Sequence, residues 1–127
     1  MFRRALVILI VLAAATPWSP AAGQDAQPHV VATYFHRTFR CQTCLDIEDL
    51  ARYAVEMERT EAVEAGRLSW RVVNFEEEAN THYAEEYALD GPTLVLERVV
   101  DGKVATWVKL EETWNLYGDT PKFDTYV

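Results

Sequence analysis

The distribution of apolar residues along the chain predicts four β-strands. Two runs rich in β-branched and aromatic residues, 29–35 (HVVATYF) and 68–75 (LSWRVVNF), have the length and composition of buried strands. Two further runs, 93–100 (TLVLERVV) and 103–110 (KVATWVKL), flank the dipeptide Asp101-Gly102. Because an Asp-Gly pair favours a two-residue hairpin turn, these last two strands are expected to be antiparallel neighbours.

Apolar positions at helical spacing lie between these strands. From Cys41 onward, apolar residues recur three and four positions apart, which predicts a long helix that ends at Gly66. A second helix is expected to begin at the capping residue Asn80 and to run through Leu89, and a short third helix spans 111–117. The recurring apolar positions of the first helix are Ile47, Leu50, Ala51, Ala54 and Val55.

The predicted element order, β-α-β-α-β-β-α, places the chain in the α/β class. A strand–helix–strand unit implies a parallel pair joined by a right-handed crossover, and the hairpin adds antiparallel strands. One mixed four-stranded sheet with helices on both faces satisfies these connections. The chain of 127 residues has the length of one domain, which we expect over residues 29–118, followed by a polar C-terminal tail at 119–127.

The first 23 residues have the pattern of a secretory signal peptide. A short basic start with Arg3 and Arg4 precedes an uncharged apolar run at 5–15, and small residues follow up to Gly23. The sequence therefore predicts an exported protein that begins, after cleavage, with a flexible tail at 24–28. The alternative is an uncleaved membrane anchor, although the apolar run is short for a bilayer span.

The charge balance argues against one class of partner. The formal net charge at pH 7 is −8, and it becomes −10 without residues 1–23, whose only charged side chains are Arg3 and Arg4. A protein this acidic repels the phosphate backbone of nucleic acids. We therefore expect no nucleic-acid partner.

The strongest chemical signal is the segment Cys41-Gln42-Thr43-Cys44, which holds both cysteines of the chain. The segment follows a predicted strand and opens a predicted helix, where free N–H groups and the positive end of the helix dipole stabilise a thiolate. A thiolate of low pKa attacks disulfides readily, or leaves readily when attacked. We assign Cys41 as the nucleophile and Cys44, one turn further in, as the resolving cysteine. Three basic residues are expected to modulate the thiol pKa: His36 when protonated, Arg37 and Arg40.

Two other interpretations of the cysteine pair stay open. The first is a structural disulfide in a non-catalytic interaction module, although a bridge that closes so small a loop removes little chain entropy. The second is a carrier that binds cuprous ion or arsenite through both thiolates. Two cysteines make only half of a tetrahedral zinc site, so we expect no resident metal.

A second motif, Gly91-Pro92-Thr93, precedes the third strand. Together with the intervening helix, strand and helix, the two motifs resemble the thioredoxin superfamily over about residues 29–117. The resemblance implies a thioredoxin-like fold in which Pro92 follows a cis peptide bond and packs near the sulfurs. It also implies that the exposed backbone of Gly91 pairs with a substrate segment as an added strand.

The chain departs from the thioredoxin pattern in three places. Arg40 stands where thioredoxins carry a tryptophan, and Gln42-Thr43 replaces the usual Gly-Pro between the cysteines. Residues 34–36 occupy the region of a buried acid that helps proton transfer from the second cysteine. Within that region, His36 is a candidate for the proton role.

A further resemblance is carried by Tyr34-Phe35-His36, Arg40-Cys41, Thr43-Cys44 and Ile47-Glu48. These residues are similar to those of small exported proteins named the ArsF-type nitrophenyl-compound nitroreductase subunit family. This resemblance implies a protein of the bacterial periplasm or cell envelope that works beside a membrane thiol-electron carrier. The nitroreductase activity in the family name has no counterpart in the sequence, which shows no flavin or nicotinamide fingerprint.

The sequence thus predicts an exported thiol–disulfide oxidoreductase. Its redox group is the Cys41–Cys44 pair itself, and no other cofactor is expected. Its expected partners are protein thiols or disulfides of the envelope, together with a membrane electron carrier that recycles the pair.

Overall fold

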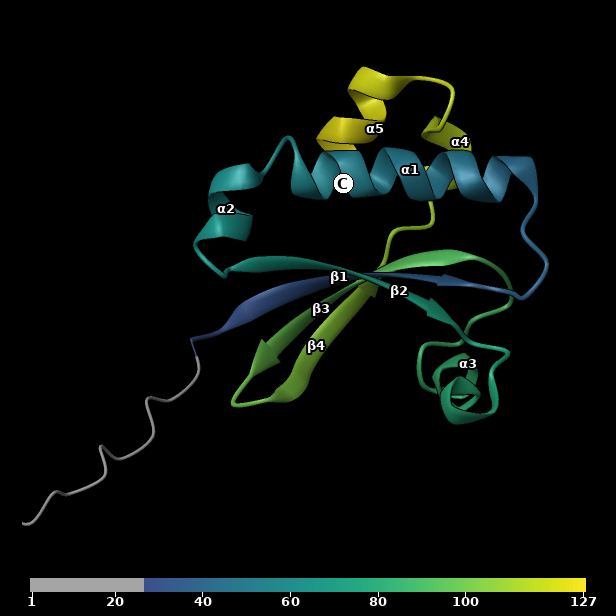
Figure 1. The fold of residues 1–127 in the computed structure, drawn as a ribbon, viewed down its shortest axis with the longest axis horizontal. Coiled ribbons are helices and arrows are strands. Elements are labelled where there is room, and N and C mark those ends of the chain that lie inside the picture. The colour runs from purple at the N-terminus through teal and green to yellow at the C-terminus, as the bar shows by residue number, and fades with distance from the viewer. Residues whose placement is uncertain (1–26) are drawn as a thin grey trace, which may run out of the picture.

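A computed structural model describes residues 27–127 and contains one mixed four-stranded sheet (Figure 1). The strands lie in the order β2-β1-β3-β4. β1 pairs in parallel with β2, whereas β3 is antiparallel to both β1 and β4. The predicted α/β class and mixed sheet are therefore confirmed. The strand bounds are β1 (His29–His36), β2 (Leu68–Asn74), β3 (Thr93–Val100) and β4 (Lys103–Lys109).

The signal peptide predicted for residues 1–23, and most of the tail predicted for 24–28, lie outside the described residues. Export and cleavage therefore stay predictions. Within residues 27–127, no helix combines the length and the apolar character that crossing a membrane requires.

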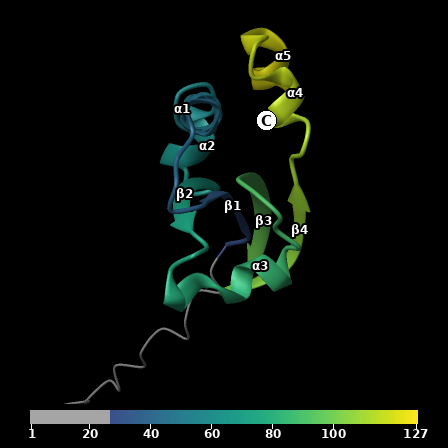
Figure 2. The ribbon, with the colours of Figure 1, turned by 90° about the vertical axis from the view of Figure 1, so that its right-hand side faces the viewer.

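Helices cover both faces of the sheet, as the element order predicts (Figures 1 and 2). One face carries α1 (Gln42–Glu56), α2 (Thr60–Glu64), α4 (Thr113–Leu116) and α5 (Thr120–Tyr126). The opposite face carries α3 (His82–Glu86), which follows the 3-10 turn η1 (Glu78–Asn80). The cysteine-bearing helix α1 thus lies in the thicker of the two helical layers.

Neighbouring side chains of β1 belong to the two separate layers of the core. Tyr34 is fully buried on the α1 side, where it packs in a cluster with Ile47 and Phe123. Phe35 is also fully buried but lies in the other cluster, with its ring centroid 5.4 Å from that of Tyr87. Because side chains alternate along a strand, β1 can bury both residues only if the sheet is covered on both faces.

The long helix expected from Cys41 to Gly66 is interrupted at residues 57–59, between α1 and α2. The guanidinium of Arg59 donates to the carbonyl oxygen of Ala54 at 2.7 Å and to that of Asp124 at 2.9 Å. Arg59 thereby satisfies a carbonyl in the last turn of α1 and ties that turn to α5, which favours ending the helix there. Gly66, with a left-handed φ of 70°, ends the helical region at the predicted place.

The segment 119–127, expected to be a polar tail, forms the helix α5 instead. Its N-cap residue Asp119 accepts a hydrogen bond from the backbone N–H of Lys122, and Pro121 lies in the first turn. Phe123 is fully buried and joins the core cluster beneath α1. Burial of this one large side chain stabilises a segment that is otherwise polar.

The second predicted helix is shorter than expected. Asn80 does not cap it, because the Asn80 side-chain amide donates to the carbonyl oxygen of Asn74 at 3.0 Å. The α-helix begins only at His82 and ends at Glu86, and Ala88 adopts a left-handed φ of 50°. The amide contact back to the end of β2 therefore replaces the capping role.

A buried carboxylate lies on the α3 side of the sheet. The Glu97 side chain on β3 is 3% exposed and pairs with the guanidinium of Arg71 at 3.1 Å. Thr33 and Tyr87 donate hydroxyl hydrogen bonds to the same carboxylate at 3.1 Å and 2.6 Å. Burial of the Tyr87 hydroxyl raises its pKa, and its hydrogen bond to Glu97 adds to the rise. The buried charge is fully paired, which is the condition under which proteins tolerate one.

Candidate redox site

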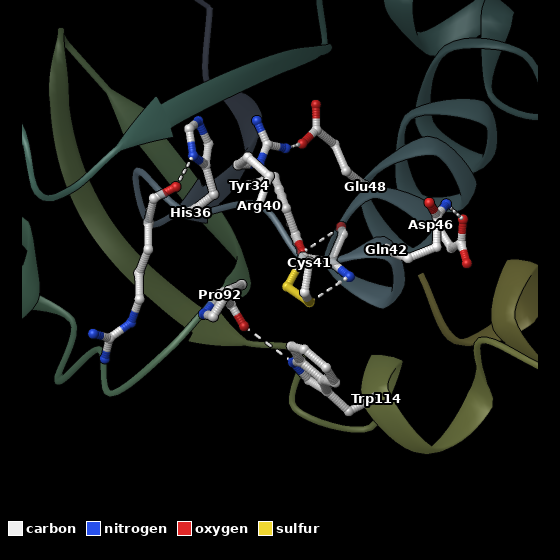
Figure 3. Close-up of a disulfide and its surroundings, with 11 residues drawn as sticks. Tyr34, His36, Arg40, Cys41, Gln42, Asp46, Glu48, Pro92 and Trp114 are labelled. Atoms are coloured by element: carbon white, nitrogen blue, oxygen red, sulfur yellow. Dashed lines mark hydrogen bonds and ion pairs between the residues drawn. A yellow bond between two sulfur atoms is a disulfide. The ribbon is translucent and has the colours of Figure 1, made fainter.

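The two cysteines form a disulfide at the N-terminus of α1 (Figure 3). Cys41 is the N-cap residue, and its Sγ accepts a hydrogen bond from the backbone N–H of Cys44 at 3.1 Å. The sulfur atoms are 2.04 Å apart and the Cα atoms 5.0 Å apart. The sequence spacing of the two cysteines therefore brings the sulfurs within bonding distance, as predicted.

The two cysteines differ in their exposure to solvent. Cys44 is 5% exposed, whereas Cys41 is only half-buried. Attack by an outside thiolate needs an open approach to one sulfur. Of the two cysteines, Cys41 is therefore the more open to attack from outside.

A buried tyrosine lies behind the inner cysteine. The Tyr34 hydroxyl donates to the carbonyl oxygen of Cys44 at 2.9 Å. Burial raises the pKa of Tyr34 to about 12, although the nearby charge of Arg40 opposes the rise. The hydroxyl is therefore protonated at neutral pH and acts as a donor. Where the thioredoxin pattern has a buried acid, this chain holds a neutral hydroxyl.

Arg40 and Glu48 form an ion pair beside the disulfide (Figure 3). Arg40 directly precedes Cys41, and Glu48 lies on α1 one helical turn after Cys44. Their side chains are 26% and 18% exposed, so water screens the pair less than it screens a surface pair. The predicted basic neighbour of Cys41 is thus present, but its charge is compensated by Glu48. In the sequence, Glu48 stands out only in the Ile47-Glu48 segment of the family resemblance, which gives it no role in the site.

The other two basic residues predicted near Cys41 are engaged elsewhere. The Nδ1–H of His36, at the end of β1, donates to the carbonyl oxygen of Arg37 at 2.7 Å. The Arg37 guanidinium donates to the carbonyl oxygen of Asp90 at 2.7 Å and lies 3.5 Å from the Glu76 carboxylate. Arg37 therefore ties the loop before Pro92 to the loop after β2, and its charge is shared with Glu76.

The Gly91–Pro92 peptide bond is trans, which corrects the cis bond that the thioredoxin resemblance implied. The trans isomer is the lower-energy form of most X-Pro bonds. In this conformation the carbonyl oxygen of Pro92 accepts a hydrogen bond from Trp114 Nε1 at 3.0 Å. Pro92 and Trp114 both belong to the surroundings of the disulfide (Figure 3).

A cavity of about 310 Å³ opens beside Pro92. Gly91 lines it, as does the partly exposed indole of Trp114. No sequence signal identified Trp114, because it reaches Pro92 from a helix 22 residues away along the chain. The full lining is Asp90, Gly91, Pro92, Thr93, Leu110, Glu111 and Trp114.

Residues 27–127 contain no group of three or more His, Cys, Asp or Glu side chains arranged to hold a metal ion. The described chain therefore offers no third protein ligand that would join Cys41 and Cys44 around a metal. A carrier role would have to rely on the two thiolates of the reduced pair.

Comparison with known proteins returns two thioredoxins among solved structures. Oxidized thioredoxin O2 from Arabidopsis thaliana is 12% identical over 74% of this chain and 74% of its own, with a TM-score of 0.41. Thioredoxin from Fasciola hepatica is 20% identical over 75% of this chain and 81% of its own, with a TM-score of 0.39. No protein-family model matches the sequence, and no curated protein matches it.

The fold itself is thioredoxin-like by its topology. The sheet order is β2-β1-β3-β4, with β1 parallel to β2 and the other pairs antiparallel. Helices cover both faces, and a CxxC disulfide opens the helix that follows the central strand β1. The chain is thus an α/β protein of thioredoxin-like fold that carries a CxxC-spaced disulfide.

Proposed function

We propose that this protein is a thiol–disulfide oxidoreductase that exchanges with protein partners through Cys41. The observation that carries the proposal is the asymmetric disulfide at the N-terminus of α1, with one half-buried and one buried cysteine. A helix N-terminus stabilises the thiolate that forms or leaves during exchange.

The reaction is a two-step exchange that conserves electrons. In the reduced protein, the Cys41 thiolate attacks a partner disulfide, forms a mixed disulfide and releases one partner sulfur as a thiolate, which takes up a proton. The Cys44 thiolate then attacks Cys41 Sγ, which closes the Cys41–Cys44 disulfide and releases the second partner sulfur. The partner disulfide gains two electrons, which the cysteine pair loses. The oxidised pair runs the same steps in reverse on a partner dithiol.

The partner binds across the cavity beside Pro92. Gly91 and Pro92 form one wall and Trp114 another, which suits an extended peptide segment that leads its sulfur to Cys41. Phe39, 81% exposed and two residues before Cys41, supplies a further apolar contact. An exposed aromatic side chain next to a reactive group is typical of a recognition surface.

The physiological setting that we propose is the cell envelope of a bacterium. The signal-like residues 1–23 support export, and an exported pair needs an electron donor or acceptor outside the cytosol. A membrane thiol-electron carrier fits this need. The finer resemblance to the ArsF-type nitroreductase subunit family has no matching family model and stays a prediction.

Trapping of the mixed disulfide tests the exchange. The Cys44→Ser variant lacks the resolving sulfur, so it should accumulate a covalent complex with a disulfide-containing peptide that added reductant releases. The matched control is Cys41→Ser, in which the remaining thiol is buried and should trap far less. If neither variant captures a disulfide peptide, or both capture it equally, the proposed mechanism is wrong.

The equilibrium reduction potential separates exchange from a structural bridge. A value between about −120 mV, typical of disulfide donors, and about −270 mV, typical of thioredoxin, supports exchange and gives its direction. A value below about −300 mV, reached only slowly, would show that the bridge is structural.

A further inference from the structure

We propose that Glu48 is a positioning residue that sets the reactivity of Cys41 by neutralising Arg40. The proposal rests on the thiol–disulfide exchange proposed above. It adds a second charged residue to the site, one that acts on the sulfur only through the arginine. Removing the Glu48 carboxylate should therefore make the cysteine pair more oxidising, whereas removing the Arg40 guanidinium should make it more reducing.

The placement of the ion pair carries the proposal. Arg40 is joined to Cys41 through the backbone, and its guanidinium turns toward Glu48 on α1 (Figure 3). Glu48 stands four residues after Cys44, so that it faces the same side of the helix as the inner cysteine. Both side chains are about three-quarters shielded from water or more. A charge in this setting acts on the sulfur with less screening than a surface charge.

Other charged groups around the disulfide are more exposed than Arg40 and Glu48 or already have a partner. Arg37 is shared between Glu76 and a backbone carbonyl, and the Asp46 carboxylate accepts from the exposed Gln42 amide at 2.8 Å. Glu111, which lines the cavity, pairs with Lys109 at 3.2 Å. The remaining titratable neighbours are Tyr34 and His36 on β1 and Asp90 in the loop before Pro92.

The chemical consequence concerns the reduced state. When a partner dithiol reduces the disulfide, the partner is oxidised, and the Cys41 thiol releases its proton to water to give the thiolate. A guanidinium on the residue next to the cysteine favours this thiolate, and a carboxylate paired with that guanidinium cancels part of the effect. A more stable thiolate stabilises the reduced form and raises the reduction potential. Arg40 and Glu48 therefore act on the same quantity with opposite signs.

Four variants test the inference. Glu48→Gln removes the negative charge but keeps an amide oxygen that can accept from Arg40, and Glu48→Asp keeps the charge. Arg40→Gln removes the positive charge, and the double variant R40Q/E48Q removes both. The matched control is Asp49→Asn, which breaks the exposed Asp49–Arg52 pair on the same helix and changes the net charge by the same amount as Glu48→Gln.

Two readouts isolate the electrostatic effect. Thiolate absorbance and alkylation of the reduced protein, followed from about pH 4 to 9, give the fraction of Cys41 thiolate. The equilibrium with glutathione gives the redox constant of the pair. At pH values below the midpoint of the Cys41 thiol titration, Glu48→Gln should raise the thiolate fraction by about threefold to tenfold. Arg40→Gln should lower this fraction by a similar factor. R40Q/E48Q, E48D and D49N should all stay near wild type.

Opposite shifts in the two charge-removing variants, with return toward wild type in the double variant, support the inference. Equal behaviour of Glu48→Gln and Asp49→Asn would overturn it, because the effect would then follow the net charge. Shifts of the same sign in R40Q and E48Q would also overturn it, because they would indicate a lost structural contact. A wild-type pair that stays oxidised in both glutathione and dithiothreitol would instead refute the proposed exchange itself.

Discussion

The substitution Tyr34→Phe tests the buried hydroxyl behind the disulfide. The substitution removes one oxygen from a fully buried side chain and leaves its ring in the core. The lost bond is the 2.9 Å hydrogen bond to the carbonyl oxygen of Cys44. A neutral buried hydrogen bond contributes about 1 kcal/mol to the free energy of unfolding. At neutral pH the variant should therefore be about 1 kcal/mol less stable than the wild type.

The same substitution should have the opposite effect in alkali. Burial raises the pKa of Tyr34 from its usual value of 10.0 to about 12 in the folded protein. Between these two values the unfolded chain loses the phenolic proton and the folded chain keeps it, so the stability of the wild type falls as the pH rises. A pKa difference of two units lowers the free energy of unfolding of the wild type by about 2.7 kcal/mol in total. This loss is complete only above about pH 12. The phenylalanine variant lacks this loss.

The assay is urea unfolding of the oxidised protein at a series of pH values from about 8 to 12. The free energy of unfolding of the wild type minus that of Tyr34→Phe should fall from about +1 kcal/mol at pH 8 to about −1.3 kcal/mol at pH 12. Titration of Tyr87, whose pKa is also raised, is common to both proteins and cancels in the difference. Tyr53→Phe, at a half-exposed side chain, is the control.

The sign change is the decisive feature. A wild-type-minus-variant difference that stays constant from about pH 8 to 12 would refute the reasoning, because the Tyr34 hydroxyl would then titrate alike in the folded and unfolded chains. A flat difference near zero would also show that the bond to Cys44 adds nothing to stability.

Three further predictions concern the stability of the fold that holds the site. Phe123→Ala should lower the free energy of unfolding by about 3 to 5 kcal/mol in urea titrations, and a loss below about 1 kcal/mol would mean that α5 lies outside the cooperative core. Gly102→Ala should destabilise the hairpin by about 1 kcal/mol, because Gly102 has a φ of 74°, and an unchanged midpoint would contradict this. Hydrogen bonds from Thr38, chiefly its backbone N–H, hold the pKa of Glu76 below its usual value of 4.5. The stability that this contact contributes is therefore present above pH 4.5 and is lost as the pH falls through the lowered pKa. Glu76→Gln should lack this part of the acid sensitivity when the two proteins are unfolded in parallel from about pH 5 to 3.

Local features of the fold could be predicted from the sequence because they depend on neighbouring residues. The strand runs and the helical spacing after Cys41 gave the correct sheet, since burial on one or both faces imposes a period on the residues themselves. The Asp101-Gly102 turn was equally local, and both residues adopt a left-handed φ, of 51° and 74°. The disulfide followed from its spacing at a helix start.

Several elements could not be predicted because distant contacts decide them. Residues 119–127 are polar on average, and the burial of Phe123 beneath α1, with Tyr126 and Val127 packed against the same cluster, stabilises them as a helix. The break after α1 depends on Arg59, which reaches the carbonyl of Asp124 on α5. At Pro92 the family resemblance implied a cis bond, whereas the structure has a trans bond with the Trp114 indole on the Pro92 carbonyl.

The sequence by itself determined the four strands, the α/β class and the cysteine pair, because periodicity, turn chemistry and cysteine spacing all act over a few residues. Only the tertiary structure decided the electrostatics around that pair. Basic residues 36, 37 and 40 all precede Cys41 in sequence, yet the fold turns Arg37 toward Glu76 and Arg40 toward Glu48. The physical reason is that the effect of a charge depends on its distance, partners and burial, which are set when separate elements pack together.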